Sequence, residues 1–148
     1  MDHKNIPTRE QVPEEFTWNL QDMYESDEKW FAEYEALKAM PERIAAFKGR
    51  LGESAEALLA YFRLEDELEV RLGMLFGYAG CKADQDTGNG SCQDMRGKAI
   101  ATLVAASSAS AFAAPEIMAI DEDTLNLFYI AQPGLGTYRR SLYQIRRR

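Results

Sequence analysis

The fold of this 148-residue chain is decided by the stretch LEDELEVRLGMLFGYAGCKA (64–83), DQDTGNG (84–90) and SCQDMRGKAIATLVAASSASAFAA (91–114). Apolar residues in the first segment recur every three or four positions, which is the period of one helix face. The Asp, Gly and Asn residues that follow are typical of a turn, because they tolerate the left-handed backbone that reverses a helix. We therefore predict a long αα-hairpin over about residues 64–114, with one buried stripe on its first helix: Leu64, Leu68, Leu72, Leu75 and Ala79.

Small residues are predicted to form the seam of this hairpin. The first helix carries Gly73, Gly77 and Gly80 on one side. Facing small residues let two helix backbones approach closely and gain dispersion contacts. Each interior glycine costs roughly 1 kcal/mol of helix propensity relative to Ala, so we interpret the three as close-packing positions rather than as signs of a weak helix. The second helix offers small partners at a similar spacing: Ala99, Thr102, Ala106, Ser110 and Ala113.

The flanking segments predict further helices and no strand. One helix should end or kink at Pro41, because proline clashes with the preceding turn. Another should reach a junction near Arg63 before the hairpin begins. We expect Trp18 and Tyr24 to anchor the N-terminal segment on these helices. Good N-cap residues precede three of the predicted helices: Ser26, Ser54 and Asp121.

The predicted class is therefore all-α, an antiparallel helical bundle built on the hairpin. We expect a flexible leader at 1–15, an N-terminal helical lobe at 16–114 and a following helical segment at 115–148. The last helix is amphipathic but reaches Arg148 without a C-cap or a glycine, so we interpret it as truncated. The sequence leaves the order of residues 134–148 open.

Composition limits the function classes. With 46% hydrophobic and 28% charged residues, the chain can form a core. Residues 1–123 hold all 24 acids and 12 of the 17 bases, so they carry −12, whereas residues 124–148 carry +5. An acidic body repels phosphate, which argues against a nucleic-acid partner. The uncharged run 99–115 is shorter than the about 20 residues of a membrane span, and the polar N-terminus is no signal peptide. We expect a cytoplasmic protein without a membrane partner.

No catalytic constellation stands out in the sequence. Zinc needs at least three well-placed ligands, but the only histidine is His3, and Cys81 and Cys92 are not a CxxC pair. The two cysteines are interpreted as small buried hydrophobes, and the alternative is a redox-sensitive disulfide across the hairpin. DQDTGNG lacks the glycine and glutamate of a calcium loop at the required places, so its polar groups are expected to serve the turn.

Two charged runs are both interpreted as solvated helix faces. The acidic run 65–69 (EDELE) is predicted to be a solvated helix face. The arginines near the C-terminus are interpreted as the solvated side of the last helix, although an anionic partner is the alternative. These arginines are Arg139, Arg140, Arg146, Arg147 and Arg148.

Several segments in a fixed order resemble the N-terminal region of oligoendopeptidase F, a zinc metallopeptidase of the thimet oligopeptidase type. The resemblance covers about residues 10–148. The sequence departs from the family pattern at GNGS (88–91), where Asn-Pro often follows the turn, and at Arg140, where histidine is common. The resembling segments are FTWNLQDMYESDEKW (16–30), AAFKGRLGESAEALL (45–59), DQDTGN (84–89) and YRRSLYQI (138–145).

The resemblance implies an all-helical lobe that forms one wall of a deep substrate channel. Family members hydrolyse internal bonds of short peptides in the cytoplasm, with one zinc ion held by HExxH and a downstream glutamate. This sequence contains no HExxH, so no catalytic, cofactor-binding or metal-ligating residue is assigned to it. The implied partners are a catalytic domain of the same polypeptide, continuing after Arg148, and short peptide substrates of the complete protein.

Two other functions stay open. The chain is alternatively a stand-alone helical interaction module, or a cytoplasmic enzyme with carboxylate chemistry of its own. An HExxH motif encoded beyond Arg148 favours the peptidase, and a stop codon there favours the module. The sequence determines neither the peptide specificity nor whether homo-oligomers form, nor the redox state of Cys81 and Cys92.

Overall fold

The computed structural model describes Pro7 and Arg9–Arg147, that is, all residues except 1–6, 8 and 148. This part of the chain forms α-helices and short 3-10 turns and contains no strand, which confirms the all-α prediction. The chain divides into two compact units. Unit 1 comprises the described residues up to Leu37 together with Arg71–Leu103, and unit 2 comprises Lys38–Val70 and the described residues from Val104 onward.

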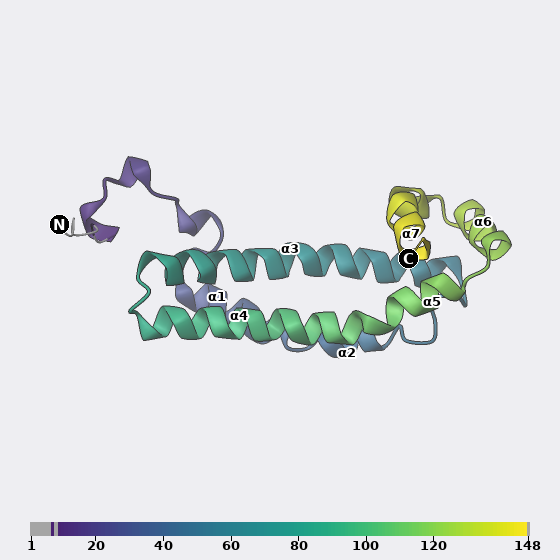
Figure 1. Cartoon of the computed structure of the whole chain (residues 1–148), viewed down its shortest axis with the longest axis horizontal. Helices are drawn as coiled ribbons and strands as arrows, with labels where there is room; N and C mark the ends of the chain where they lie inside the picture. The colour runs from purple at the N-terminus through teal and green to yellow at the C-terminus, as the bar shows by residue number, and fades with distance from the viewer. Residues whose placement is uncertain (1–6, 8, 148) are drawn as a thin grey trace. The chain divides into compact units, whose positions relative to one another are not determined.

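Unit 1 is a helical hairpin covered by one further helix. Helix α1 (Asp27–Leu37) contacts the second half of α3 (Ala55–Gln85), and α3 is followed by the antiparallel α4 (Gly90–Ala109) (Figure 1). The fully buried Trp30 of α1 donates its indole N–H to the carbonyl oxygen of Leu75 at 2.8 Å. The hairpin and its buried leucine stripe are thus confirmed, because all five predicted positions of the stripe are buried.

Side chains, not left-handed residues, make the turn of the hairpin. Gly88 donates its backbone N–H to the Asp86 carboxylate at 3.0 Å, and Asn89 accepts from the backbone N–H of Ser91 and of Cys92 at 3.1 and 3.2 Å. The prediction that polar side chains serve the turn is confirmed. The prediction of a left-handed backbone there is wrong, because Gly49 is the only described residue with a positive φ, at 80°.

The predicted glycine seam is also wrong. A methyl group added at Gly73 or Gly80 meets no atom within 4 Å, and one added at Gly77 meets the Met23 sulfur of the N-terminal segment at 3.6 Å. The glycines therefore do not bring α3 close to α4. Buried Leu72, Leu75 and Ala79 fill the space that faces the rest of unit 1 instead.

Replacing Gly73 by Ala is expected to raise the free energy of unfolding by about 0.5–1 kcal/mol, because alanine is the better helix former and its methyl group meets nothing. Urea unfolding followed by far-UV circular dichroism measures the change. The matched control is Gly49→Ala, which should lower the stability by about 1–2 kcal/mol because its φ of 80° is strained for L residues. A loss of stability in Gly73→Ala would restore the close-packing interpretation.

The helix boundaries differ from the prediction at two places. Helix α3 runs without a break from Ala55 to Gln85, so the predicted junction near Arg63 is wrong. The residues around it are strong helix formers, and neither Gly nor Pro interrupts them. The second arm ends earlier than predicted, at Ala109, where a 3-10 turn (Ser110–Phe112) follows. A cluster of serines precedes this turn, and serine hydroxyls compete with the helical hydrogen bonds.

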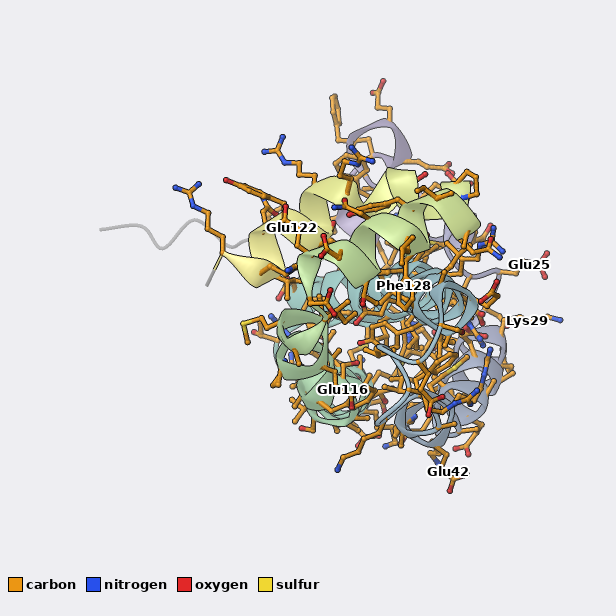
Figure 2. All side chains as sticks on the ribbon, turned by 90° about the vertical axis from the view of Figure 1, so that its right-hand side faces the viewer. Glu25, Lys29, Glu42, Glu116, Glu122 and Phe128 are labelled. Carbon is orange, nitrogen blue, oxygen red and sulfur yellow. The ribbon has the colours of Figure 1, made fainter. Side chains whose placement is uncertain are left out.

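Unit 2 packs several short helices on the first half of α3. Two loop amides are held by one carboxylate: Glu116, labelled in Figure 2, accepts from the backbone N–H of Gly49 at 2.5 Å and of Leu51 at 3.3 Å. Leu135 and Leu142 are fully buried in this unit. Its other elements are α2 (Met40–Ala45), α5 (Ala113–Ala119), α6 (Glu122–Ala131), the 3-10 turn η5 (Pro133–Tyr138) and α7 (Arg139–Arg146).

Local signals predicted the helix starts well. Ser26, Ser54 and Asp121 each accept from the backbone N–H three positions further on, at 3.4, 3.1 and 2.8 Å respectively, so all three predicted caps are confirmed. Helix α1 ends before Pro41, as predicted. Of the two predicted anchors, Tyr24 is confirmed, because it packs edge-on against Tyr78 at 5.4 Å between ring centres. The prediction for Trp18 is wrong, since 84% of this residue is exposed.

The run from Gly90 to Ala119 is long and apolar enough to cross a membrane by length and composition. Core helices of soluble proteins have the same character, so this finding alone does not assign a span. Four large apolar side chains on it are exposed: Ile100, Leu103, Val104 and Met118. The absence of a membrane partner stays a prediction, as do the boundaries of the leader (1–15), the lobe (16–114) and the following segment (115–148).

Candidate functional site

The described part of the chain holds no catalytic assembly. Within residues 7 and 9–147, no three His, Cys, Asp or Glu side chains gather as metal ligands would. His3, the only histidine of the sequence, lies outside the described residues. Cys81 and Cys92 are both free and partly exposed, so their interpretation as buried hydrophobes is wrong, and they form no disulfide. The described residues therefore do not fit a zinc site, and no chemical step is derived through zinc.

The acidic run 65–69 is only in part a solvated face. Tyr61 is buried, and its hydroxyl donates to the Glu65 carboxylate. The Tyr138 hydroxyl donates to the Asp66 carboxylate. Burial raises the pKa of Glu65; the hydrogen bond from Tyr61 opposes this shift, whereas the neighbouring negative charges of Asp66 and Glu69 add to it. Burial also raises the pKa of Tyr61, and the adjacent Glu65 adds to that shift. The contact of Tyr138 with Asp66 joins η5 to α3, whereas that of Tyr61 with Glu65 lies within α3 itself.

A second polar cluster lies in unit 1 and fixes α1 on α3. The Asp27 carboxylate accepts from the Lys82 ammonium at 2.5 and 2.6 Å and from the Tyr78 hydroxyl at 2.8 Å. Burial acts to raise the pKa of Asp27, but the hydrogen bonds from Lys82 and Tyr78 outweigh it, so the pKa is lowered. The same lysine and tyrosine line a hollow of about 490 Å³ together with Trp18. Sequence analysis missed this cluster because its members are 51 and 55 residues apart.

The most distinctive site lies between α6 and α7 in unit 2, and we name it the α6–α7 groove. It has a volume of about 410 Å³. Helix α6 contributes Asn126 and Tyr129 to its lining, and Glu122, labelled in Figure 2, also lines it. Helix α7 contributes one tyrosine and three arginines: Tyr143, Arg139, Arg146 and Arg147.

The side chains of the α6–α7 groove are oriented by the way α7 packs. Leu142 is fully buried, and Arg139 and Arg146, three positions before it and four after it, flank it on the same side of α7. The Arg139 guanidinium lies 4.6 Å from the centre of the Tyr129 ring, and that of Arg147 lies 6.0 Å from the centre of the Tyr143 ring. Such stacking holds an arginine in place and leaves its N–H groups free to donate.

The arginines of α7 have no acidic partner in the part of the chain that the structure describes. No carboxylate oxygen there lies within 4.0 Å of a nitrogen of Arg139, Arg140, Arg146 or Arg147. Arg139, Arg140 and Arg147 are exposed, as the solvated-side interpretation expects. Arg140 does not line the α6–α7 groove; it lines an adjoining hollow with Gln144, and that hollow shares Tyr143 and Arg147 with the groove. Arg148 is outside the described residues.

Comparison with known proteins finds that this helical chain is similar to part of several bacterial peptidases. No family model matches it. Oligopeptidase PepF of Bacillus subtilis is 37% identical over 95% of this chain. Group B oligopeptidase PepB of Streptococcus agalactiae is 30% identical over 88% of it. The chain is related to the oligoendopeptidase F family. It spans only 21% and 22% of the lengths of these two relatives.

Solved structures agree with this relationship. The crystal structure of oligoendopeptidase-F from Enterococcus faecium superposes with a TM-score of 0.72 at 27% identity, over 81% of this chain and 24% of that one. A Chlamydophila abortus crystal structure gives a TM-score of 0.82 over 96% of this chain and 24% of that one; at 19% identity it shows the fold alone. The resemblance to oligoendopeptidase F seen in the sequence is therefore confirmed.

Proposed function

We propose that this chain is the helical lobe of an oligopeptidase of the oligoendopeptidase F type, inactive alone, and that a catalytic domain of the same polypeptide carries the chemistry. The observation that supports it is the match over 95% of this chain but only 21% of Bacillus subtilis oligopeptidase PepF.

In this proposal the complete protein acts on short peptides in the cytoplasm. An HExxH motif outside this sequence would hold its zinc ion, and that ion would supply the Lewis-acid chemistry of peptide hydrolysis. The chain's own residues hold a helical wall in place. Trp30 in unit 1 and Glu116 in unit 2 are the contacts that fix helices and loops for that purpose.

A graft into the Bacillus subtilis oligopeptidase tests the proposal. Replacing the matched segment by this chain should preserve hydrolysis of a fluorogenic oligopeptide, whereas deleting the segment should lower kcat/KM by at least about 100-fold, because misplaced catalytic groups lose that much. This chain alone should show no hydrolysis with or without added zinc. Hydrolysis by the chain alone, or full activity of the deletion variant, would contradict the proposal.

The alternative function is the stand-alone interaction module. The α6–α7 groove is the observation that favours it, since its arginines lack acidic partners among the described residues. Reading the coding sequence past Arg148 separates the two: an HExxH motif downstream supports the peptidase, and a stop codon supports the module.

A further inference from the structure

We propose that the α6–α7 groove binds an acidic polypeptide segment whose two carboxylates lie three residues apart on one side of a polyproline II conformation. Its arginines hold the carboxylates, and its tyrosines pack against the backbone and the side-chain stems between them. This proposal does not depend on the proposed peptidase function.

The spacing comes from the geometry of α7. Arg139, Tyr143 and Arg146 occupy positions i, i+4 and i+7, so they lie along one face of the helix. Seven residues of helix span about 10 Å. A polyproline II chain rises about 3.1 Å per residue with three residues per turn, so its residues i and i+3 lie on the same side, about 9 Å apart. A peptide of the pattern Glu-x-x-Glu therefore places one carboxylate at each arginine with the tyrosine ring between them.

The charges of the groove favour an anion. Its lining contains three arginines and one carboxylate, Glu122, which forms no ion pair with them within 4.0 Å. On α5, which packs against α7, the carboxylate of Glu116 is already engaged by two backbone amides. Residues 124–147 contain no acid at all. The groove therefore has unsatisfied cationic donors and only one competing charge.

Carboxylates fit these donors better than a nucleic acid does. The planar guanidinium matches a carboxylate in a two-point geometry, and the groove is short. The chain as a whole carries −7, which opposes a long polyanion whose many phosphates extend over the acidic body. A short acidic peptide avoids this repulsion, because at 0.1 M salt charges beyond about 10 Å are screened. Tyrosine and arginine are also the residues that contribute most at peptide-binding surfaces.

Fluorescence anisotropy on the full chain tests the proposal. The probe is a fluorescein-labelled, end-capped peptide with two glutamates separated by two alanines. It should bind with an affinity that falls as salt increases, and Arg146→Gln should weaken binding by at least about tenfold, since charge-assisted hydrogen bonds are lost. Arg140→Gln is the matched control: it removes the same charge one turn and a half away, outside the groove, and should change the affinity by less than about twofold.

Further peptides and variants separate the proposal from its rivals. A peptide with glutamine in place of both glutamates should not bind, and one with adjacent glutamates should bind more weakly. Arg146→Lys keeps the charge but loses the planar fork, so it should fall between the original and Arg146→Gln. Equal effects of Arg140→Gln and Arg146→Gln would overturn the proposal, and so would tighter binding of a single-stranded DNA oligonucleotide through the same arginines. Unchanged far-UV circular dichroism verifies that each variant is folded.

Discussion

Replacing Trp30 by Ala is expected to lower the free energy of unfolding by about 3–5 kcal/mol, the largest effect of any single change in unit 1. The indole is fully buried between α1 and α3, and Tyr34 stacks on it at 5.7 Å between ring centres. Its N–H donates to the carbonyl oxygen of Leu75 at 2.8 Å. Truncation therefore removes apolar burial, leaves a cavity and removes the direct hydrogen bond between the two helices.

Urea unfolding followed by far-UV circular dichroism measures this loss without relying on tryptophan fluorescence. Trp30→Phe keeps most of the packing but not the hydrogen bond, so it should cost about 1–2 kcal/mol. Trp18→Ala is the matched control, because that indole is 84% exposed and its removal should change stability by less than about 0.5 kcal/mol. If both tryptophans proved equally costly, Trp30 would not be the anchor of α1.

The two tryptophans also show the limit of sequence reasoning. Both lie in the segment that resembles oligoendopeptidase F, and both are large apolar residues near predicted helices. Burial of Trp30 involves a long-range contact with α3, because the carbonyl oxygen that accepts from its indole belongs to Leu75, 45 residues further along the chain. The prediction therefore placed an anchor at Trp18, where the structure has an exposed ring.

Features with local causes could be predicted. The cap at Asp121 involves a residue three positions away, and the leucine stripe of α3 follows from the helical period alone. The break expected near Arg63 failed for a related reason, since no breaker residue is there and tertiary packing let α3 continue. The glycine seam failed because small size permits close approach but does not require it.

Only part of the α6–α7 groove could be predicted from the sequence. The arginines were evident, and an anionic partner was an alternative to a solvated face. The missing part was the pairing of Arg139 with Tyr129, ten residues earlier and across the turn η5. That turn brings α7 back beside α6, and its geometry depends on the burial of Leu135, which no sequence period singles out.

Replacing Leu142 by Ala is expected to cost about 2–5 kcal/mol of the free energy that holds α7 in unit 2. Leu142 is the one fully buried side chain among the described residues of this eight-residue helix, and α7 packs on α5. So short a helix is unstable by itself in water, so its structure depends on this contact. Because α7 can open locally, the global unfolding transition will understate the loss.

Amide hydrogen exchange of α7 is therefore the appropriate measurement. Protection of its amides should fall by about 30-fold or more, since each 1.4 kcal/mol corresponds to a factor of ten. Leu127→Ala on α6 is the matched control, because that leucine is 64% exposed and its loss should leave exchange in α7 unchanged. The same variant tests whether the packing of α7 matters for binding. If Leu142 keeps the arginines of the α6–α7 groove in position, Leu142→Ala must lower the affinity for the Glu-x-x-Glu peptide although it removes no charge. Full protection of α7 in Leu142→Ala would show that another contact holds the helix.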